Sequence, residues 1–156
     1  MAALLAMTAC SPQEANAPVP VAATTAQHPV SGLDVVPLTV TSGTAVHRFD
    51  VEVARNDEEQ GKGLMFRTEL GPNEGMIFPR DPPDIAGFYM KNTPLPLDII
   101  FIGADGRILN IAANTTPYSL DTVRAAGMTS LVLELAGGRA AELGIEPGDR
   151  VEWQDR

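Results

Sequence analysis

Residues 90–102 read Met-Lys-Asn-Thr-Pro-Leu-Pro-Leu-Asp-Ile-Ile-Phe-Ile and place charged and amide side chains at the start of an apolar run. From Leu97 onward the residues are mostly branched or aromatic, and the turn residues 103–106 follow them, a pattern typical of a β-strand. Pro94 and Pro96 hold the residues before them in extended conformations. We therefore expect a stiff turn that leads directly into a strand.

Asp98 is the unusual residue of this strand. Because side chains alternate across a strand, Asp98 shares its face with Ile100 and Ile102. Removing a carboxylate from water costs on the order of several kcal/mol unless a cation or hydrogen-bond donors meet it. We expect Asp98 to pair with Lys91 or Arg67, or else to lie at a solvated strand end.

Glu134 repeats this pattern, because residues 129–135 place three leucines on one face and Val132 and Glu134 on the other. If the two strands pair, both acids and one of the two cations line one cavity. The candidate ligand-binding residues are therefore Arg67, Lys91, Asn92, Thr93, Asp98 and Glu134. The alternative is structural, an internal salt bridge with Asn92 and Thr93 bonding the turn backbone.

The rest of the chain favours strands over helices. Asn56 with Glu59 forms a capping box that predicts a helix from Asp57 to about Arg67. A second short helix is expected at 139–143. Strands are predicted at 33–40, 46–54, 76–78, 87–91, 97–102, 107–112, 129–135 and 151–153, with the first at a sheet edge because of Pro37. Residues 79–84 are predicted as a loop, and residues 121–126 as a helical turn or irregular chain. The predicted fold is mainly β, an antiparallel β-sandwich or partly closed barrel with two short helices.

The N-terminal region predicts an anchor and a tether. Residues 1–10 are an apolar run that ends at Cys10, the only cysteine, and resemble the end of a lipoprotein signal peptide. The run is shorter than the ~20 residues of a membrane span and has no basic start, so we expect the true start to lie upstream. Residues 11–32 are rich in Pro and Ala and predict a disordered tether, which leaves 33–156 as a single domain. The alternative is a cytoplasmic tail with an incidental cysteine.

Composition narrows the classes of partner. The net charge of −9 opposes binding to phosphate backbones, so nucleic acid is not an expected partner, and membrane contact is expected only through a lipid on Cys10. No cluster of Cys and His with metal-ligand spacing is present, and we predict no metal site and no cofactor. Met65, Met76 and Met90 leave a copper site as a lesser alternative, because thioethers favour Cu(I).

Six ordered segments resemble the signature of the domain of unknown function 192 family. They are Gly63–Arg67, Gly75–Phe78, Met90–Thr93, Pro96–Ile102, Leu133–Leu135 and Gly144–Asp149, and the resemblance spans about Phe49 to Trp153. Tyr89 departs from the family pattern, which usually has tryptophan there. The resemblance implies a compact, mainly β domain that is often secreted or envelope-associated in bacteria, and it implies no reaction.

Three functions follow from these residues. The first is a binding or interaction module that is tethered to the cell envelope in the periplasm. It is expected to bind a small polar or anionic ligand or an envelope protein at the Met90–Thr93 turn. The second is a metal-free hydrolase in which Asp98 and Glu134 divide into acid and base. The third is copper binding. No nucleophile with a base, phosphate loop or cofactor motif supports an enzyme.

Overall fold

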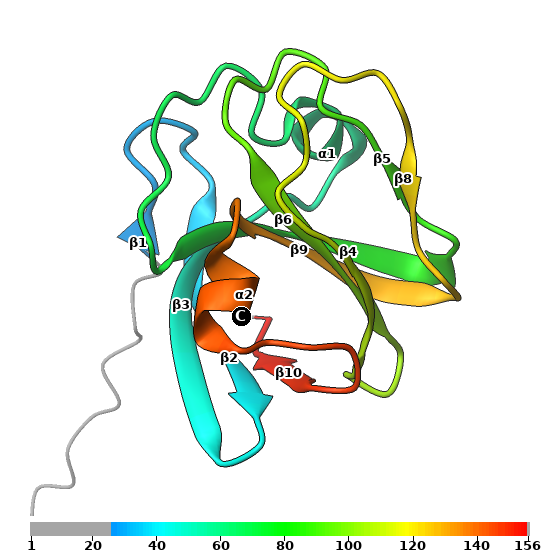
Figure 1. Ribbon diagram of the computed structural model, residues 1–156. Helices are drawn as coiled ribbons and strands as arrows, with labels where there is room; N and C mark the ends of the chain where they lie inside the picture. The colour runs from blue at the N-terminus through cyan, green and yellow to red at the C-terminus, as the bar shows by residue number, and fades with distance from the viewer. Residues whose placement is uncertain (1–25, 156) are drawn as a thin grey trace, which may run out of the picture.

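The computed structural model describes residues 26–155, which form a curved eight-stranded sheet, a two-stranded sheet and two short helices (Figure 1). The elements of the large sheet run in the order β1-β2-β3-β4-β9-β6-β7, and β10 also pairs with β2. The strands are β1 (Ala26–Gln27), β2 (Asp34–Ser42), β3 (Ala45–Val53), β4 (Glu74–Asp84), β5 (Gly87–Phe88), β6 (Leu97–Gly103), β7 (Ile108–Ala112), β8 (Val123–Arg124), β9 (Thr129–Ala136) and β10 (Arg150–Trp153). The helices are α1 (Asp57–Lys62) and α2 (Arg139–Leu143).

The large sheet is antiparallel except where β3 and β4 pair in parallel across the α1 connection. Its two ends approach each other at one isolated bridge, between Arg107 and Arg150. A single bridge is not a ladder, so the sheet does not close into a barrel. The prediction of a mainly β fold with two short helices is confirmed.

Both faces of the central strands β4, β9 and β6 are buried, each against its own core. The inner core lies within the curve of the sheet, and α2 packs there (Figure 1). The outer core lies beneath α1, the β5–β8 sheet and the loops that join them. Because strands covered on both faces carry apolar residues on both, this part of the sequence reads as nearly continuous hydrophobic runs.

Local signals explain the ends of the helices. The capping box is present, since the Asn56 side chain accepts a hydrogen bond from the Glu59 amide at 2.9 Å and Glu59 reaches back to the Asn56 amide. The helix ends at Lys62 rather than near Arg67, because Gly63 takes a positive φ of 47° and breaks the helical path. Gly144 ends α2 in the same way, as expected.

Several predicted elements differ from the structure. The prediction that Pro37 puts its strand at an edge is wrong, because β2 pairs with β3 on one side and with β1 and β10 on the other. Pro37 falls between Val35, which pairs with β1, and Leu38, which pairs with β10, so its missing N–H is accommodated. Residues 79–84, predicted as a loop, continue β4 with a shift in register. The undecided segment 121–126 contains β8.

The predicted tether overlaps the described structure. Of residues 11–32, the last seven are described: Ala26 and Gln27 form β1 against β2, and the chain then turns through Ser31. Cys10 and residues 11–25 lie outside the described residues, so the predictions of an anchor and of a tether along that segment stay predictions.

Candidate ligand-binding site

Three carboxylates are buried in the described chain. The exposed fractions of their residues are 3% for Glu52, 0% for Asp98 and 5% for Glu134. A buried carboxylate needs a cation or hydrogen-bond donors, so the partners of these three groups separate structural roles from a possible site.

Asp98 is satisfied by the backbone. Its Oδ1 accepts hydrogen bonds from the amides of Asn114 at 2.7 Å and Gly138 at 2.9 Å, and its Oδ2 accepts one from the amide of Ala140 at 2.8 Å. The prediction of a Lys91 or Arg67 partner is therefore wrong. Because amide donors of the α2 N-terminus and the loop after β7 take the place of a cation, Asp98 joins these segments to β6.

Arg67 pairs instead with Glu52. Its Nη1 donates to Glu52 Oε1 at 2.8 Å, and Ser31 donates its hydroxyl to the other oxygen of the same carboxylate. His28 lies 3.7 Å from that oxygen and 3.2 Å from Arg67 Nη2. The alternation along β3 placed Glu52 on the solvent face, but the N-terminal segment covers that face, so this cluster was missed.

Glu134 lies on the opposite face of the sheet from Asp98. In the antiparallel β6–β9 pair Asp98 is opposite Leu135, whereas Glu134 is opposite Ile99, and residues opposite each other share a face. Asp98 therefore faces the inner core and Glu134 the outer core. The two strands pair as supposed, but the two acids do not line one cavity, and the predicted carboxylate pair is wrong.

The carboxylate of Glu134 has no partner among residues 26–155, neither a hydrogen-bond donor nor a cation. Burial alone raises the pKa of Glu134 to about 8, because the charged form loses its hydration and nothing replaces it. Near neutral pH the group is therefore largely protonated, and it is both a potential donor and a potential anion.

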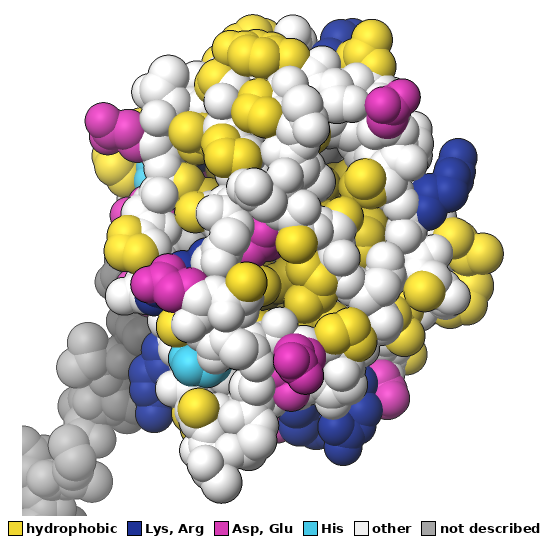
Figure 2. Space-filling model, in the orientation of Figure 1, with side chains coloured by type: hydrophobic (Ala, Val, Ile, Leu, Met, Phe, Trp, Pro, Cys, Tyr) yellow, Lys and Arg dark blue, Asp and Glu magenta, His cyan; other side chains and the backbone are white. Residues whose placement is uncertain are grey.

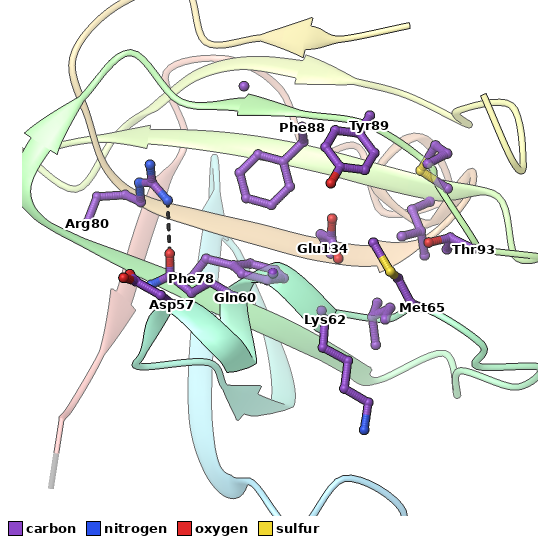
Figure 3. A pocket seen from close by; sticks show the side chains of 16 residues that line it. Asp57, Gln60, Lys62, Met65, Phe78, Arg80, Phe88, Tyr89, Thr93 and Glu134 are labelled. Atoms are coloured by element: carbon purple, nitrogen blue, oxygen red, sulfur yellow. Dashed lines mark hydrogen bonds between the residues drawn. The ribbon is translucent and has the colours of Figure 1, made fainter. Parts of the chain in front are cut away.

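Glu134 lines a pocket of about 280 Å³ in the outer layer. Figure 3 shows the Glu134 carboxyl group among the side chains of α1, β4 and the β5 region. The pocket is mixed in character, since three aromatic rings and two thioethers accompany a few polar groups. Its lining residues are Asp57, Gln60, Gly61, Lys62, Gly63, Leu64, Met65, Phe78, Arg80, Gly87, Phe88, Tyr89, Met90, Thr93, Leu97 and Glu134.

The charged neighbours of this pocket are occupied or point elsewhere. Arg80 forms an ion pair with Asp84, which raises the pKa of Arg80 and lowers that of Asp84, and it donates to Gln60 at 2.9 Å. In Figure 3 the Lys62 side chain extends away from Glu134. Of the three buried carboxylates in the described chain, Glu134 is thus the one without a hydrogen-bond or ion-pair partner.

The Met90–Thr93 turn forms one end of the pocket through Met90 and Thr93. Asn92 takes a positive φ of 55°, and its carbonyl accepts a hydrogen bond from the Phe66 amide at 2.7 Å. The Thr93 carbonyl accepts one from the Tyr118 amide at 3.1 Å. The turn therefore joins two loops through its backbone. The Thr93 hydroxyl donates to the Lys91 carbonyl at 3.2 Å, which is the turn-bonding role weighed for that side chain, while the Lys91 side chain is exposed.

The loops joined by this turn carry exposed hydrophobic side chains. Phe66 is 71% exposed and Tyr118 is 62% exposed, and both have positive φ. Figure 2 shows hydrophobic side chains gathered at the top of the molecule, above the region of α1, with charged side chains spread over the remaining surface. Leu120 is exposed on the same loop as Tyr118.

The methionines are only partly brought together. Met65 and Met90 line the pocket, but Met76 is not among its lining residues. The Met90 sulfur accepts a hydrogen bond from Thr115 at 3.1 Å, and Asn92 Nδ2 lies 3.8 Å from the Met65 sulfur. Among the described residues no group of three or more His, Cys, Asp and Glu is arranged to hold a metal ion. Copper binding stays an untested prediction.

Comparison with known proteins identifies the family. Residues 38–153 match the model of DUF192, described as Uncharacterized ACR. The chain belongs to the DUF192 family. This DUF192 domain is similar to the crystal structure of a protein of unknown function from Novosphingobium aromaticivorans DSM 12444, with 61% identity, a TM-score of 0.82, and coverage of 85% of this chain and 94% of that chain. No curated protein matches.

A second solved structure is also similar to this DUF192 domain. It is that of a proposed transcription regulator from Sinorhizobium meliloti 1021, with 34% identity, a TM-score of 0.75, and coverage of 78% of this chain and 95% of that chain. Neither helix described in the DUF192 domain is both long and apolar enough to span a bilayer.

Of the six predicted ligand-binding residues, Thr93 and Glu134 lie in the pocket. Arg67 and Asp98 are engaged elsewhere, and Lys91 and Asn92 are not among the pocket residues. Several pocket residues were not predicted from the sequence, among them the aromatic residues Phe78, Phe88 and Tyr89 and the polar pair Gln60 and Arg80. The aromatic pair directly before Met90 was the one available signal for them.

Proposed function

We propose that this DUF192 domain is a binding module that takes a small organic ligand in the pocket at Glu134. The observation that carries the proposal is a buried carboxylate without a partner that lines a pocket. Leaving such a group unpaired costs free energy, and a ligand that pairs with it recovers that cost. Pockets that bind small ligands combine apolar side chains with a few oriented polar groups, and the lining of this pocket contains both.

A binding role is favoured over a hydrolase with paired carboxylates. That mechanism needs an acid and a base on either side of one substrate, and Asp98 and Glu134 lie on opposite faces of the sheet. The three backbone donors to Asp98 give it a structural role. Glu134 is left as the one buried carboxylate of the pocket for holding a ligand.

We further propose that the domain is exported and held at the cell envelope by a lipid on Cys10. The support is the sequence of residues 1–32 and the net charge, which opposes direct adhesion to an anionic membrane. Labelling of bacteria with radioactive palmitate tests this: the protein expressed from its natural gene should take up label, and the Cys10→Ala variant should not. Equal labelling of both proteins contradicts the anchor.

The binding proposal is tested by protein-observed NMR with four small probes of different charge: choline, 3,3-dimethylbutan-1-ol, N-methylacetamide and acetate. At least one probe should bind saturably, with amide shift changes concentrated at Gly63, Gly87 and Thr93, which line the pocket. Glu134→Leu should reduce or abolish this binding. If none of the four probes causes saturable changes in the pocket, the proposal is overturned.

A further inference from the structure

We infer, on the basis of the proposed binding function, that the ligand carries an alkylated ammonium group, which the Glu134 carboxylate neutralises among aromatic side chains. The first step is the charge of the pocket. Its other charged side chains are Asp57 and Lys62 from α1 and Arg80 from β4. Arg80 is paired with Asp84, Lys62 extends outward (Figure 3), and Asp57 is exposed at the start of α1, so Glu134 is the buried charge left for a ligand to meet.

The second step is the apolar surface around that carboxylate. Phe78 and Phe88 pack edge to face with their ring centroids 5.0 Å apart, and both line the pocket with Tyr89. Figure 3 shows the Phe88 and Tyr89 rings on one side of Glu134 and Phe78 and Met65 on the other. Aromatic faces attract cations, and they do so most strongly where water is excluded.

The third step separates an organic cation from a metal ion. Calcium and magnesium bind six or more oxygen ligands, waters included, whereas no group of three or more His, Cys, Asp and Glu among the described residues is arranged to hold a metal ion. An ammonium group substituted with methyl groups is weakly hydrated, and it gives methyl contacts to the rings and a positive charge to the carboxylate. Recognition of quaternary ammonium by aromatic side chains uses this combination.

Protonation gives the inference a distinctive signature. Because burial raises the pKa of Glu134 to about 8, a cation that binds near neutral pH must displace the proton from the carboxyl group. Cation affinity should therefore rise roughly tenfold per pH unit below about pH 8 and then level off. A neutral ligand that accepts a hydrogen bond from protonated Glu134 shows the opposite trend. The other titratable groups at the pocket are Asp57, Lys62, Arg80 and Tyr89.

The experiment is calorimetric titration of the full chain with choline and with its uncharged isostere 3,3-dimethylbutan-1-ol. At pH 8.5 choline should bind at least about tenfold more tightly than the alcohol. At pH 7, titrations in phosphate and in Tris should differ in enthalpy by close to one released proton per choline bound. Glu134→Gln should weaken choline by at least about tenfold, remove its pH dependence and leave the alcohol unchanged.

The outcomes separate the inference from the proposed function. If the alcohol, N-methylacetamide or acetate binds in the pocket as tightly as choline or more tightly, the pocket is a binding site and the cation inference is overturned. If choline binds without proton release and equally well to Glu134→Gln, Glu134 is not its counter-ion and the inference fails. If no probe binds, both proposals fail. Proton release uses the unaltered protein, so the test stands even if the variant does not fold.

Discussion

Glu134→Gln should make the domain more stable at alkaline pH than the natural protein. The substitution keeps the shape of the side chain and removes its ability to ionise. In the natural protein burial raises the pKa of Glu134 to about 8, compared with the ordinary value of 4.5 for a glutamate exposed to water. Between those two values the folded state holds a proton that the unfolded state has lost, so raising the pH favours unfolding.

The magnitude follows from that window. Each pH unit between 4.5 and 8 lowers the free energy of unfolding of the natural protein by about 1.4 kcal/mol relative to Glu134→Gln. From pH 5 to pH 8 the relative change approaches about 4 kcal/mol, a large fraction of the 5–15 kcal/mol, roughly, that stabilises a typical domain. The full effect of the carboxyl group is present below pH 4.5 and is lost as the pH rises through 8.

The assay is urea denaturation at half-unit steps from pH 5 to pH 8.5, followed by the fluorescence of Trp153, the single tryptophan, which is half-buried in β10. Glu58→Gln is the matched control, because Glu58 is an exposed residue of α1 and its curve should stay parallel to that of the natural protein. A constant difference between Glu134→Gln and the natural protein across this range would refute the reasoning. It would mean that the folded domain accommodates the charge of Glu134 without cost.

Further substitutions test the other contacts of the fold. Asp98→Asn should lower the free energy of unfolding by about 3 kcal/mol, because the new NH2 group would face one of the three backbone amides that donate to Asp98. Urea denaturation measures this change, and a loss below about 1 kcal/mol would contradict a structural role for the three hydrogen bonds. Arg67→Met should cost about 3–5 kcal/mol by removing the arginine from the buried Glu52 carboxylate, which keeps only Ser31 and His28 beside it, and the double variant with Glu52→Leu should regain most of this loss; an unchanged melting temperature for the single variant would exclude a stabilising pair. Gly75→Ala should destabilise the domain by about 1–3 kcal/mol, because the new Cβ would lie 2.5 Å from the Glu134 carbonyl oxygen. Gly61→Ala should instead stabilise it by up to about 1 kcal/mol, because the new Cβ has open space in α1. Shifts of the same sign in the melting temperatures of the two variants would contradict this packing.

The strands and helix caps were predictable because their signals are local. The hairpin of β6 and β7, the capping box of α1 and the glycine that ends α2 each depend on neighbouring residues only. Errors arose where distant segments decide. Pro37 was predicted at a sheet edge because proline is usually confined to edge strands. It lies instead at the gap between β1 and β10 on one side of β2, and because these two strands are far apart in the sequence, no local pattern indicates that gap.

The candidate site was half predictable for a related reason. Side-chain alternation correctly marked Asp98 and Glu134 as buried acids, but it carries no information on what meets them. Backbone amides that satisfy a carboxylate leave no signature of residue type, so a search for cations could not find the partners of Asp98. The clue lay in Gly137 and Gly138: a Cβ on Gly137 would lie 2.7 Å from the Asn114 side chain, so only glycine lets this loop close over Asp98.

The two acids have different roles because each face of the sheet is buried against a different core. Asp98 and Glu134 lie one residue out of step on paired strands, and that single step sends one to the inner core and the other to the outer core. On the inner side the α2 N-terminus and the loop after β7 supply donors. On the outer side the covering layer is a short helix, a two-stranded sheet and a turn, and it supplies rings and thioethers but no donor to Glu134. An acid that a fold buries without a partner lowers stability at neutral pH, and a ligand that pairs with it turns that loss into binding affinity.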